Sequence, residues 1–302
     1  APGGAYFYHD ERVRKAFGLE AANQFMMWDP ALEHRLADPR ADLEATHFDA
    51  LSGRYAFRSD ADGVQVTGGC GTIAYFHAFP SCNDFTFVKD GVLLTGPITA
   101  YSEFDWGLTK YRNVPSIENE PSPRGYTDYR QRIGAEGSQW IFMEAAPGRM
   151  EAFHVDLDAP VRYAYTRGDA TGVYNSTGAE VDDVTAAQRA MLTLLRGDRT
   201  LLFVYDVIET AQDGRFKKVH FQLPHAPSVT GHTVTMDTPS GPRLVVTSLM
   251  PDPAGTAVVA APHPEVETSP EGSSSRPADG NLVHHSVTIE RTGASPAADR
   301  FL

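Results

Sequence analysis

The feature that most constrains the fold is a series of short β-forming runs that starts near Gly53 and continues to the end of the chain. The first runs are rich in aromatic and β-branched residues, and they are Tyr55–Phe57, Val64–Val66, Thr72–Phe76, Phe85–Val88 and Val92–Leu94. Turn formers such as Asp62-Gly63 and Lys89-Asp90-Gly91 separate them. Short strands at this spacing predict a large all-β antiparallel sandwich and exclude a fold of alternating strands and helices.

The same pattern fills the second half of the chain. It runs through Trp140–Met143, Met150–Val155, Val161–Tyr165, Ala190–Leu195, Leu201–Ile208, Phe216–Leu223, Val229–Met236, Arg243–Leu249, Thr256–Ala260 and Leu282–Ile289. Leu201–Val207 is apolar on both faces, which predicts a central strand between stacked sheets. Asn113–Tyr129 and Pro262–Gly280 lack this periodicity and are expected to be loops.

The first fifty residues differ from the rest. Glu11–Met27 has the apolar spacing of one short amphipathic helix, and Trp28-Asp29-Pro30 ends it. We therefore expect a linker with a short helix over residues 1–50 and the β-sandwich domain over residues 51–302. The Ala-Pro-Gly-Gly start and the apolar Phe301-Leu302 end favour a part of a longer chain that is poorly soluble alone, with natural ends as the alternative.

Charge and cysteine content exclude several classes of protein. There are 39 acidic and 26 basic residues, so the formal net charge is −13, and no Lys/Arg run offers a nucleic-acid footprint. The apolar stretches are too short to span a bilayer, and two cysteines do not make a disulfide scaffold. Cys70 and Cys82 could meet if their strands pair, but the interpretation favoured here is two small buried apolar residues.

The densest group of chemically capable residues lies between Tyr75 and Phe85. His77 is the residue of this segment that exchanges a proton near neutral pH, although a hydrogen-bonded histidine beside a turn is the structural alternative. A Cys82–His77 nucleophile pair would lack an orienting acid. No His or Cys spacing typical of a metal site occurs, so none is predicted.

A second group follows the run that ends at Leu94. Tyr101 and Tyr111 could act as proton donor or base if nearby cations lower their pKa, or they could be packing residues. Arg112 and Asn113 come directly after Tyr111. Farther along, the alternation of His220 with its apolar neighbours predicts that this histidine faces solvent.

Several motifs in the correct order resemble the β-sheet half of the heparinase II/III-like polysaccharide lyases. They are Tyr55–Ser59, His77–Phe85, Phe87–Leu94, Gly148–Phe153, Tyr163–Tyr174, Gln188-Arg189, Leu202–Ile208 and Leu244–Pro251. The resemblance runs over nearly all of residues 25–302. That family joins a helical α/α-toroid to a super-β-sandwich and cleaves uronate-containing polysaccharides by β-elimination, so the resemblance implies a sandwich half preceded by a missing toroid.

The resemblance also assigns roles to residues. It implies that His77 and Tyr111 are catalytic, with Tyr101 in reserve for the tyrosine. Asn83, Arg112 and Asn113 become substrate contacts, because a guanidinium matches a carboxylate bidentately. The implied partners are an anionic polysaccharide and a helical toroid domain or second chain, in a secreted or periplasmic protein. The alternative is a catalytically silent sandwich that binds carbohydrate or braces its partner domain.

One departure from the family concerns zinc. Relatives read His-x-His-x-Asp-x-Asn-Ser-Phe, where the second histidine and an aspartate at a later strand end hold a structural zinc. Here Phe79 and Ser81 stand at the second histidine and the acidic position, the strand end reads Thr95-Gly96-Pro97, and Arg112 replaces a further histidine. We therefore expect that the zinc of the relatives is lost, and the sequence indicates no other cofactor.

Overall fold

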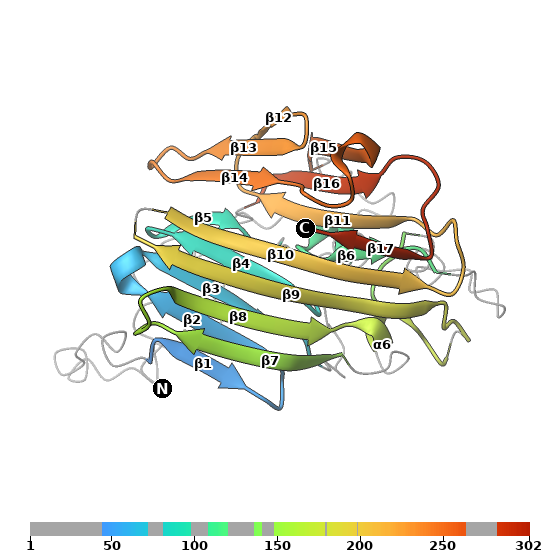
Figure 1. The fold of residues 1–302 in the computed structure, drawn as a ribbon, viewed down its shortest axis with the longest axis horizontal. Coiled ribbons are helices and arrows are strands. Elements are labelled where there is room, and N and C mark those ends of the chain that lie inside the picture. The colour runs from blue at the N-terminus through green and yellow to red at the C-terminus, as the bar shows by residue number, and fades with distance from the viewer. Residues whose placement is uncertain are drawn as a thin grey trace, which may run out of the picture.

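The described part of the chain consists of four antiparallel sheets (Figure 1). The computed structural model describes residues 44–71, 81–97, 108–119, 136–140, 148–178, 180–197, 199–263 and 283–302. Within these residues the only α-helix is the four-residue α6 (Thr171–Tyr174), and no helix is long and apolar enough to cross a membrane. The predicted all-β class is confirmed, whereas the helix expected over Glu11–Met27 lies outside the described residues.

Two five-stranded sheets form the body of the molecule. The first sheet has the order β1 (Thr46–Asp49), β2 (Arg54–Ser59), β3 (Val64–Gly69), β4 (Asp84–Lys89), β5 (Val92–Thr95). The third sheet has the order β17 (Ala298–Phe301), β10 (Arg199–Thr210), β9 (Val184–Arg196), β8 (Arg162–Asp169), β7 (Arg149–Asp156). In Figure 1 the long strands of the third sheet cross in front of the first sheet.

Two smaller sheets extend this body. The second sheet has the order β15 (Thr256–Pro262), β16 (His285–Arg291), β11 (Lys217–Leu223), β6 (Pro115–Ile117). The fourth is the meander β12 (Ser228–Thr230), β13 (Thr233–Asp237), β14 (Arg243–Thr247). The second sheet adjoins the first, because the Gly96 amide and the Thr95 hydroxyl both donate to the Gln222 carbonyl of β11, at 3.3 and 2.8 Å.

The core lies between the first and third sheets. Phe153 of β7 contacts Phe48 of β1 and Tyr55 of β2, with ring centroids 5.3 and 5.6 Å apart. On β9 the inward side chains alternate with outward ones, and Ala187, Met191 and Leu195 are all buried. This period of two is what places one face of each strand in the core and leaves the other face for solvent or a partner.

The strand predictions are largely confirmed, with two corrections. Val229–Met236 is not one strand but the hairpin β12–β13, because Gly231 takes a positive φ of 59° and turns the chain. The expected loop Asn113–Tyr129 contains β6, whose three buried residues pair with β11. The strand expected over Thr72–Phe76 lies outside the described residues, as do residues 141–143.

β10 pairs with β9 along its whole length but with β17 only over Asp206–Glu209, so most of Leu201–Val207 is not central as predicted, and it is not covered on both faces. Its inward residues Asp206 and Ile208 are fully buried, whereas Leu201 and Phe203 point outward and are 42% and 37% exposed. The apolar run Leu201–Val207 predicts a strand that is buried on both faces. Here the apolar outward residues lie instead on a half-open surface.

His220 does not face solvent, contrary to the prediction from alternation. It is buried on β11, where its Nε2 lies 3.0 Å from the Ser116 hydroxyl and its Nδ1 lies 3.1 Å from the Thr288 hydroxyl. Gln222, on the same face of β11 as His220, donates to the carbonyls of Lys110 and Arg112, so the 3-10 turn η3 (Thr109–Tyr111) lies over this face. The sequence did not show this contact. Burial lowers the pKa of His220 to about 3, so the ring is neutral in the folded protein.

This burial predicts an acid sensitivity that one substitution removes. The pKa of His220 is lower in the folded chain than in the unfolded chain, where it is near 6.5. The contribution of neutral His220 to the free energy of unfolding is therefore complete above pH 6.5. It falls between pH 6.5 and about 3, by up to about 1.4 kcal/mol per pH unit. Urea unfolding of wild type and His220→Gln at pH 7, 5 and 4 should show a difference in stability that shrinks as pH falls. A difference independent of pH would contradict a buried neutral histidine.

Candidate functional site

A cavity of about 420 Å³ opens on the outer face of the first sheet. Tyr55 points inward to Phe153, so its strand neighbour Ala56 points outward. The strand register aligns Ala56 with His47 of β1, Thr67 of β3 and, through Thr67, Thr86 of β4. All four residues line the cavity. The small side chains of Ala56, Thr67 and Thr86, together with the His47 ring, form a shallow floor that spans four strands.

Positively charged side chains surround this floor. Arg54 begins β2 and is exposed, and Arg112 reaches the cavity from the end of the short 3-10 turn η3 (Thr109–Tyr111) and is buried. Burial lowers the pKa of Arg112, and the nearby Asp84 carboxylate acts in the opposite direction. With His47, the cavity therefore holds two guanidinium groups and an imidazole within a chain whose net charge is −13.

Asp84 is the acidic residue of the cavity. It is the first residue of β4 and is buried, and its Oδ1 accepts hydrogen bonds from the backbone amides of Phe85 at 2.8 Å and Asn113 at 3.0 Å. Its buried Oδ2 has no hydrogen-bond partner among the described residues. Burial raises the pKa of Asp84, opposed mainly by the Arg112 charge. Such a carboxylate could accept a hydrogen bond from a substrate hydroxyl or hold a proton.

A buried arginine fixes the strand ends that carry these groups. Arg189 of β9 donates from Nε and Nη2 to the two carboxylate oxygens of Asp206, at 2.7 and 2.8 Å. Its Nη1 donates to the carbonyl oxygens of Asn83, at 3.1 Å, and Asn113. Asn83 itself has a φ of 67°, a left-handed conformation that asparagine tolerates better than most residues. The third sheet thus anchors the turn before β4 and the segment after Arg112.

The predicted substrate contacts occupy two kinds of position. Arg112 lines the cavity, as the substrate-binding role requires. The side chains of Asn83 and Asn113 instead serve the scaffold. Asn83 Nδ2 donates to the Gly168 carbonyl at 3.1 Å, whereas Asn113 Nδ2 donates to the Phe85 carbonyl at 2.7 Å and its Oδ1 accepts from the Gln222 amide at 2.7 Å.

The predicted catalytic residues are only partly described. Tyr111 is buried in η3, where its ring lies 5.8 Å from that of His263 and the Lys110 Nζ is 5.3 Å above it. It does not line the 420 Å³ cavity. His77 and Tyr101 lie outside the described residues, so their roles stay predictions. Two cavity residues adjoin these undescribed segments in sequence: Ser81 follows the segment that contains His77, and Pro97 precedes the segment that contains Tyr101.

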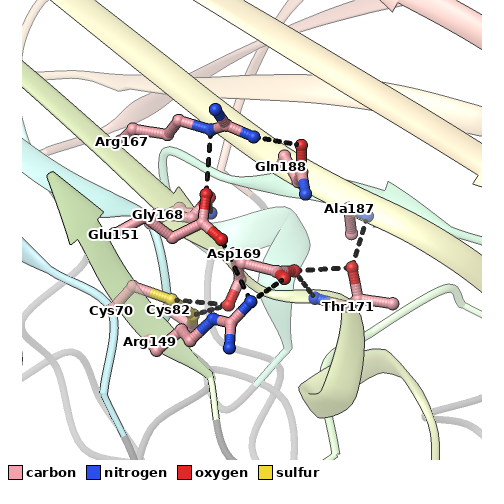
Figure 2. Close-up of polar contacts among 11 residues, drawn as sticks. Cys70, Cys82, Arg149, Glu151, Arg167, Gly168, Asp169, Thr171, Ala187 and Gln188 are labelled. Atoms are coloured by element: carbon pink, nitrogen blue, oxygen red, sulfur yellow. Dashed lines mark hydrogen bonds and ion pairs between the residues drawn. A yellow bond between two sulfur atoms is a disulfide. The ribbon is translucent and has the colours of Figure 1, made fainter.

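Cys70 and Cys82 form a disulfide, which corrects their interpretation as two free apolar residues. Both are buried as expected, and the bond encloses the segment that contains His77. Their sulfur atoms lie 3.3 and 3.9 Å from the carbonyl oxygen of Asp169 at the end of β8 (Figure 2). The sequence could not decide this pairing, because it depends on how the turn before β4 meets β3.

Asp169 connects this disulfide to a polar network on the outer face of the third sheet. Its carboxylate accepts from the amide and hydroxyl of Thr171 at 2.9 and 2.6 Å, and Arg149 lies 3.7 Å away (Figure 2). The Glu151 carboxylate forms ion pairs with Arg149 and Arg167, at 3.1 and 2.9 Å. The network holds β7 and β8 in register at the end where the disulfide packs.

We expect reduction of the disulfide to lower the free energy of unfolding by about 3 kcal/mol. The bond closes a loop in the unfolded chain and so lowers its conformational entropy, and reduction removes this restriction. The two cysteines are separated by 12 positions in sequence. Thermal melting with and without dithiothreitol measures the loss, and a double Cys70→Ser, Cys82→Ser variant should be insensitive to the reductant. An equal response of wild type and double variant would show that the reductant acts elsewhere.

Four residues with ionisable side chains line the cavity but were not among the predicted site residues. They are His47, Arg54, Tyr55 and Asp84. Each lies in or next to a strand, and its membership of the cavity depends on the register between β1, β2 and β4. The clearest available signal was Asp84, a carboxylate placed directly before the apolar run Phe85–Val88.

The residues at the zinc positions of the relatives do not suit a metal ion where they are described. The Thr95 hydroxyl donates to the Gln222 carbonyl at 2.8 Å and lies 3.1 Å from Asn113 Oδ1. Arg112 places a cation at the 420 Å³ cavity. Among the described residues, no cluster of three His, Cys, Asp or Glu side chains could hold a metal. Phe79 is not described, so the loss of the zinc stays a prediction.

The comparison with solved structures relates this geometry to known proteins. No family model and no curated protein matches the sequence. Heparinase III matches with a TM-score of 0.57 and 11% identity, over 97% of this chain and 40% of the heparinase III chain. The heparan sulfate lyase HepC from Pedobacter heparinus matches with a TM-score of 0.57 and 13% identity, over 99% of this chain and 41% of the other.

The chain has the fold of part of these two lyases. At 11% and 13% identity, the match shows the fold and does not carry over activity. It confirms the resemblance to the heparinase sandwich that the motifs indicated. The chain spans about 40% of the length of both lyases.

Proposed function

We propose that this chain is the β-sandwich part of a polysaccharide lyase that cleaves a uronic-acid-containing polysaccharide by β-elimination. The observation that supports this most is the cationic cavity on the outer face of the first sheet, in a fold shared with two such lyases. The net charge of −13 repels a polyanion, so binding requires a local basic region. The guanidinium groups of Arg54 and Arg112 supply one.

β-Elimination needs three groups, and the chain offers candidates for each. A cation must neutralise the C5 carboxylate so that the C5 proton becomes acidic, and we assign this role to Arg112 with Arg54, which both line the cavity. A base then removes the C5 proton, the C4–C5 double bond forms, and the C4–O bond breaks as an acid protonates the leaving oxygen. We assign this proton transfer to His77 and to Tyr111 or Tyr101, as the resemblance implies.

The partners and location follow as parts of the same proposal. A helical toroid domain or second chain would cover the cavity and provide the other wall of the cleft. A secreted or periplasmic protein would meet such a polymer. Asn83 and Asn113 then position the cavity through their backbone contacts with Arg189 rather than by touching the polymer.

A second candidate function is a catalytically silent sandwich that binds carbohydrate. One observation favours it: the Tyr111 side chain is buried beside His263 and does not line the cavity. A buried tyrosine is a poor proton donor unless the loop around it moves.

The test is the absorbance of unsaturated uronate on incubating the natural full-length protein with alginate, glucuronan and glycosaminoglycans. The lyase proposal predicts a rising signal on at least one polymer and loss of that signal in a folded His77→Ala variant. Binding without any absorbance change supports the silent module. Neither binding nor turnover on any uronate polymer overturns both.

A further inference from the structure

Asp84 lies on the cavity side of the first sheet, in the same row as Arg54. The next residue, Phe85, belongs to the hydrophobic core, so Asp84 points to the opposite, outer face of β4. The strand register aligns Arg54 of β2 with Gly69 of β3, and Gly69 with Asp84. The two charged residues therefore stand in one row across three strands, and both line the 420 Å³ cavity.

The glycine in the middle of this row leaves room for the Arg54 side chain. A Cβ atom on Gly69 would lie 2.9 Å from Arg54 Cδ, which is closer than such atoms approach one another. The Arg54 side chain therefore lies over β3, the strand that separates β2 from Asp84. The cavity thus holds a guanidinium on one side of Gly69 and a carboxyl group on the other.

The two oxygen atoms of Asp84 are in different situations. Oδ1 accepts the backbone amides of Phe85 and Asn113, at 2.8 and 3.0 Å. Oδ2 is buried, and no described residue provides it with a hydrogen-bond partner. Buried polar atoms are nearly always hydrogen-bonded, so an unpartnered carboxyl oxygen in the wall of a cavity indicates a group that a ligand supplies.

The charge around Asp84 restricts what that group can be. Burial raises the pKa of Asp84, and the charges of Arg112 and Arg189 oppose this shift. An anionic ligand group at Oδ2 would meet a like charge whenever Asp84 is ionised, whereas a hydroxyl can donate to the carboxylate. The arrangement therefore fits a ligand that places its own carboxylate at the guanidinium groups and a neutral hydroxyl at Asp84.

We propose that Asp84 determines specificity in this cavity: its Oδ2 accepts a hydrogen bond from a hydroxyl of the uronate ring whose carboxylate binds Arg54 and Arg112. A polymer in which this hydroxyl is free is then preferred over one in which it is sulfated, acylated or alkylated. A site built to pair with a hydroxyl discriminates strongly, because a ligand without the hydroxyl leaves the buried polar atom unpaired. This inference rests on the proposed function, since it takes the ligand to be a uronate.

The test is calorimetric binding of a glucuronan trisaccharide to the natural full-length protein. Two further trisaccharides carry fluorine in place of the C2 or the C3 hydroxyl of each ring, which removes the donor with little change in size. One of the two should bind wild type about tenfold more weakly or worse, the usual effect of losing a hydrogen bond to a charged group. In Asp84→Asn the same fluorination should weaken binding less than about threefold, because the side chain is neutral.

The matched control is Asp49→Asn. Asp49 of β1 lies opposite Arg54 in the same row, but it is not a cavity residue, and its carboxylate already accepts from the Leu51 amide and the Ser52 hydroxyl. This variant loses the same charge as Asp84→Asn and should keep the wild-type ratio of affinities. Asparagine at position 84 retains an oxygen for the two backbone amides that Oδ1 accepts, so this variant is expected to fold.

The outcomes separate this inference from the proposed function. Equal binding of all three trisaccharides to wild type would overturn the inference and leave the proposed function intact, even if Asp84→Asn failed to fold. The wild-type ratio persisting in Asp84→Asn would show that another group reads the hydroxyl. An equal loss of the ratio in Asp49→Asn would assign the effect to overall charge. No binding of the unmodified trisaccharide would contradict the proposed function and, with it, this inference.

Discussion

Replacing Arg189 with methionine is expected to destabilise the fold by about 3–5 kcal/mol. The Arg189–Asp206 pair is bidentate and both side chains are 1% exposed, so the substitution leaves a buried carboxylate without its counter-charge. It also removes the donor shared by the carbonyls of Asn83 and Asn113. Urea unfolding, analysed for a shift in midpoint at constant slope, measures the loss.

Two further variants make this prediction specific. Arg243 also donates from its Nε to a carboxylate, that of Asp237, but both side chains are more than 60% exposed. Arg243→Met should therefore change stability by less than about 0.5 kcal/mol. Arg189→Met combined with Asp206→Leu should recover much of the loss, because an apolar pair needs no counter-charge. A single Arg189→Met variant as stable as wild type would contradict a stabilising role for the Arg189–Asp206 pair and for the contacts of Arg189 with the Asn83 and Asn113 carbonyls.

Replacing Arg112 with alanine is expected to lower kcat/KM on the uronate polymer about 100-fold or more, the usual cost of removing one preorganised group that stabilises developing charge. Arg112 is buried beside Asp84, so this variant must first be shown to fold. Arg54→Ala provides the variant that is expected to fold, because Arg54 is exposed at the cavity. It should weaken polymer binding at least tenfold, or about 1.4 kcal/mol.

The matched control for Arg54 is Arg58. Both residues lie on β2 and on the same face, because they are four positions apart, but Arg58 is not a cavity residue. Arg58→Ala should leave turnover and binding unchanged. Equal losses in the two variants would mean that the polymer responds to overall charge on this face rather than to the cavity.

The sequence predicted most of the fold because the strands carry a local signal. The alternation in Val64–Val66 or Phe85–Val88 and the turn residues after them are visible in single segments. The hairpin β12–β13 was missed because its turn, Gly231-His232, interrupts an otherwise continuous β-forming run. β6 was missed because three residues among prolines give no period, and its formation depends on pairing with β11.

The candidate site could be predicted only in part. Arg112 was proposed because it stands beside Asn113 where the relatives have a histidine, and in the structure it lines the cavity. Arg54 and His47 carry no such signal, because only the register of β1 and β2 brings them to the same face. His220 and the two cysteines were misread for the same reason, since long-range contacts decide whether a side chain is covered or paired.

Calorimetric binding of a uronate oligosaccharide and of its carboxyl-reduced counterpart tests carboxylate recognition by the cavity most directly. We predict that reducing the carboxyl groups weakens binding to wild type at least tenfold. Arg54→Ala should narrow the difference in affinity between the two oligosaccharides, because it removes one of the two guanidinium groups assigned to the carboxylate and leaves Arg112. Equal affinity of wild type for the two oligosaccharides would contradict recognition of a uronate carboxylate by this cavity.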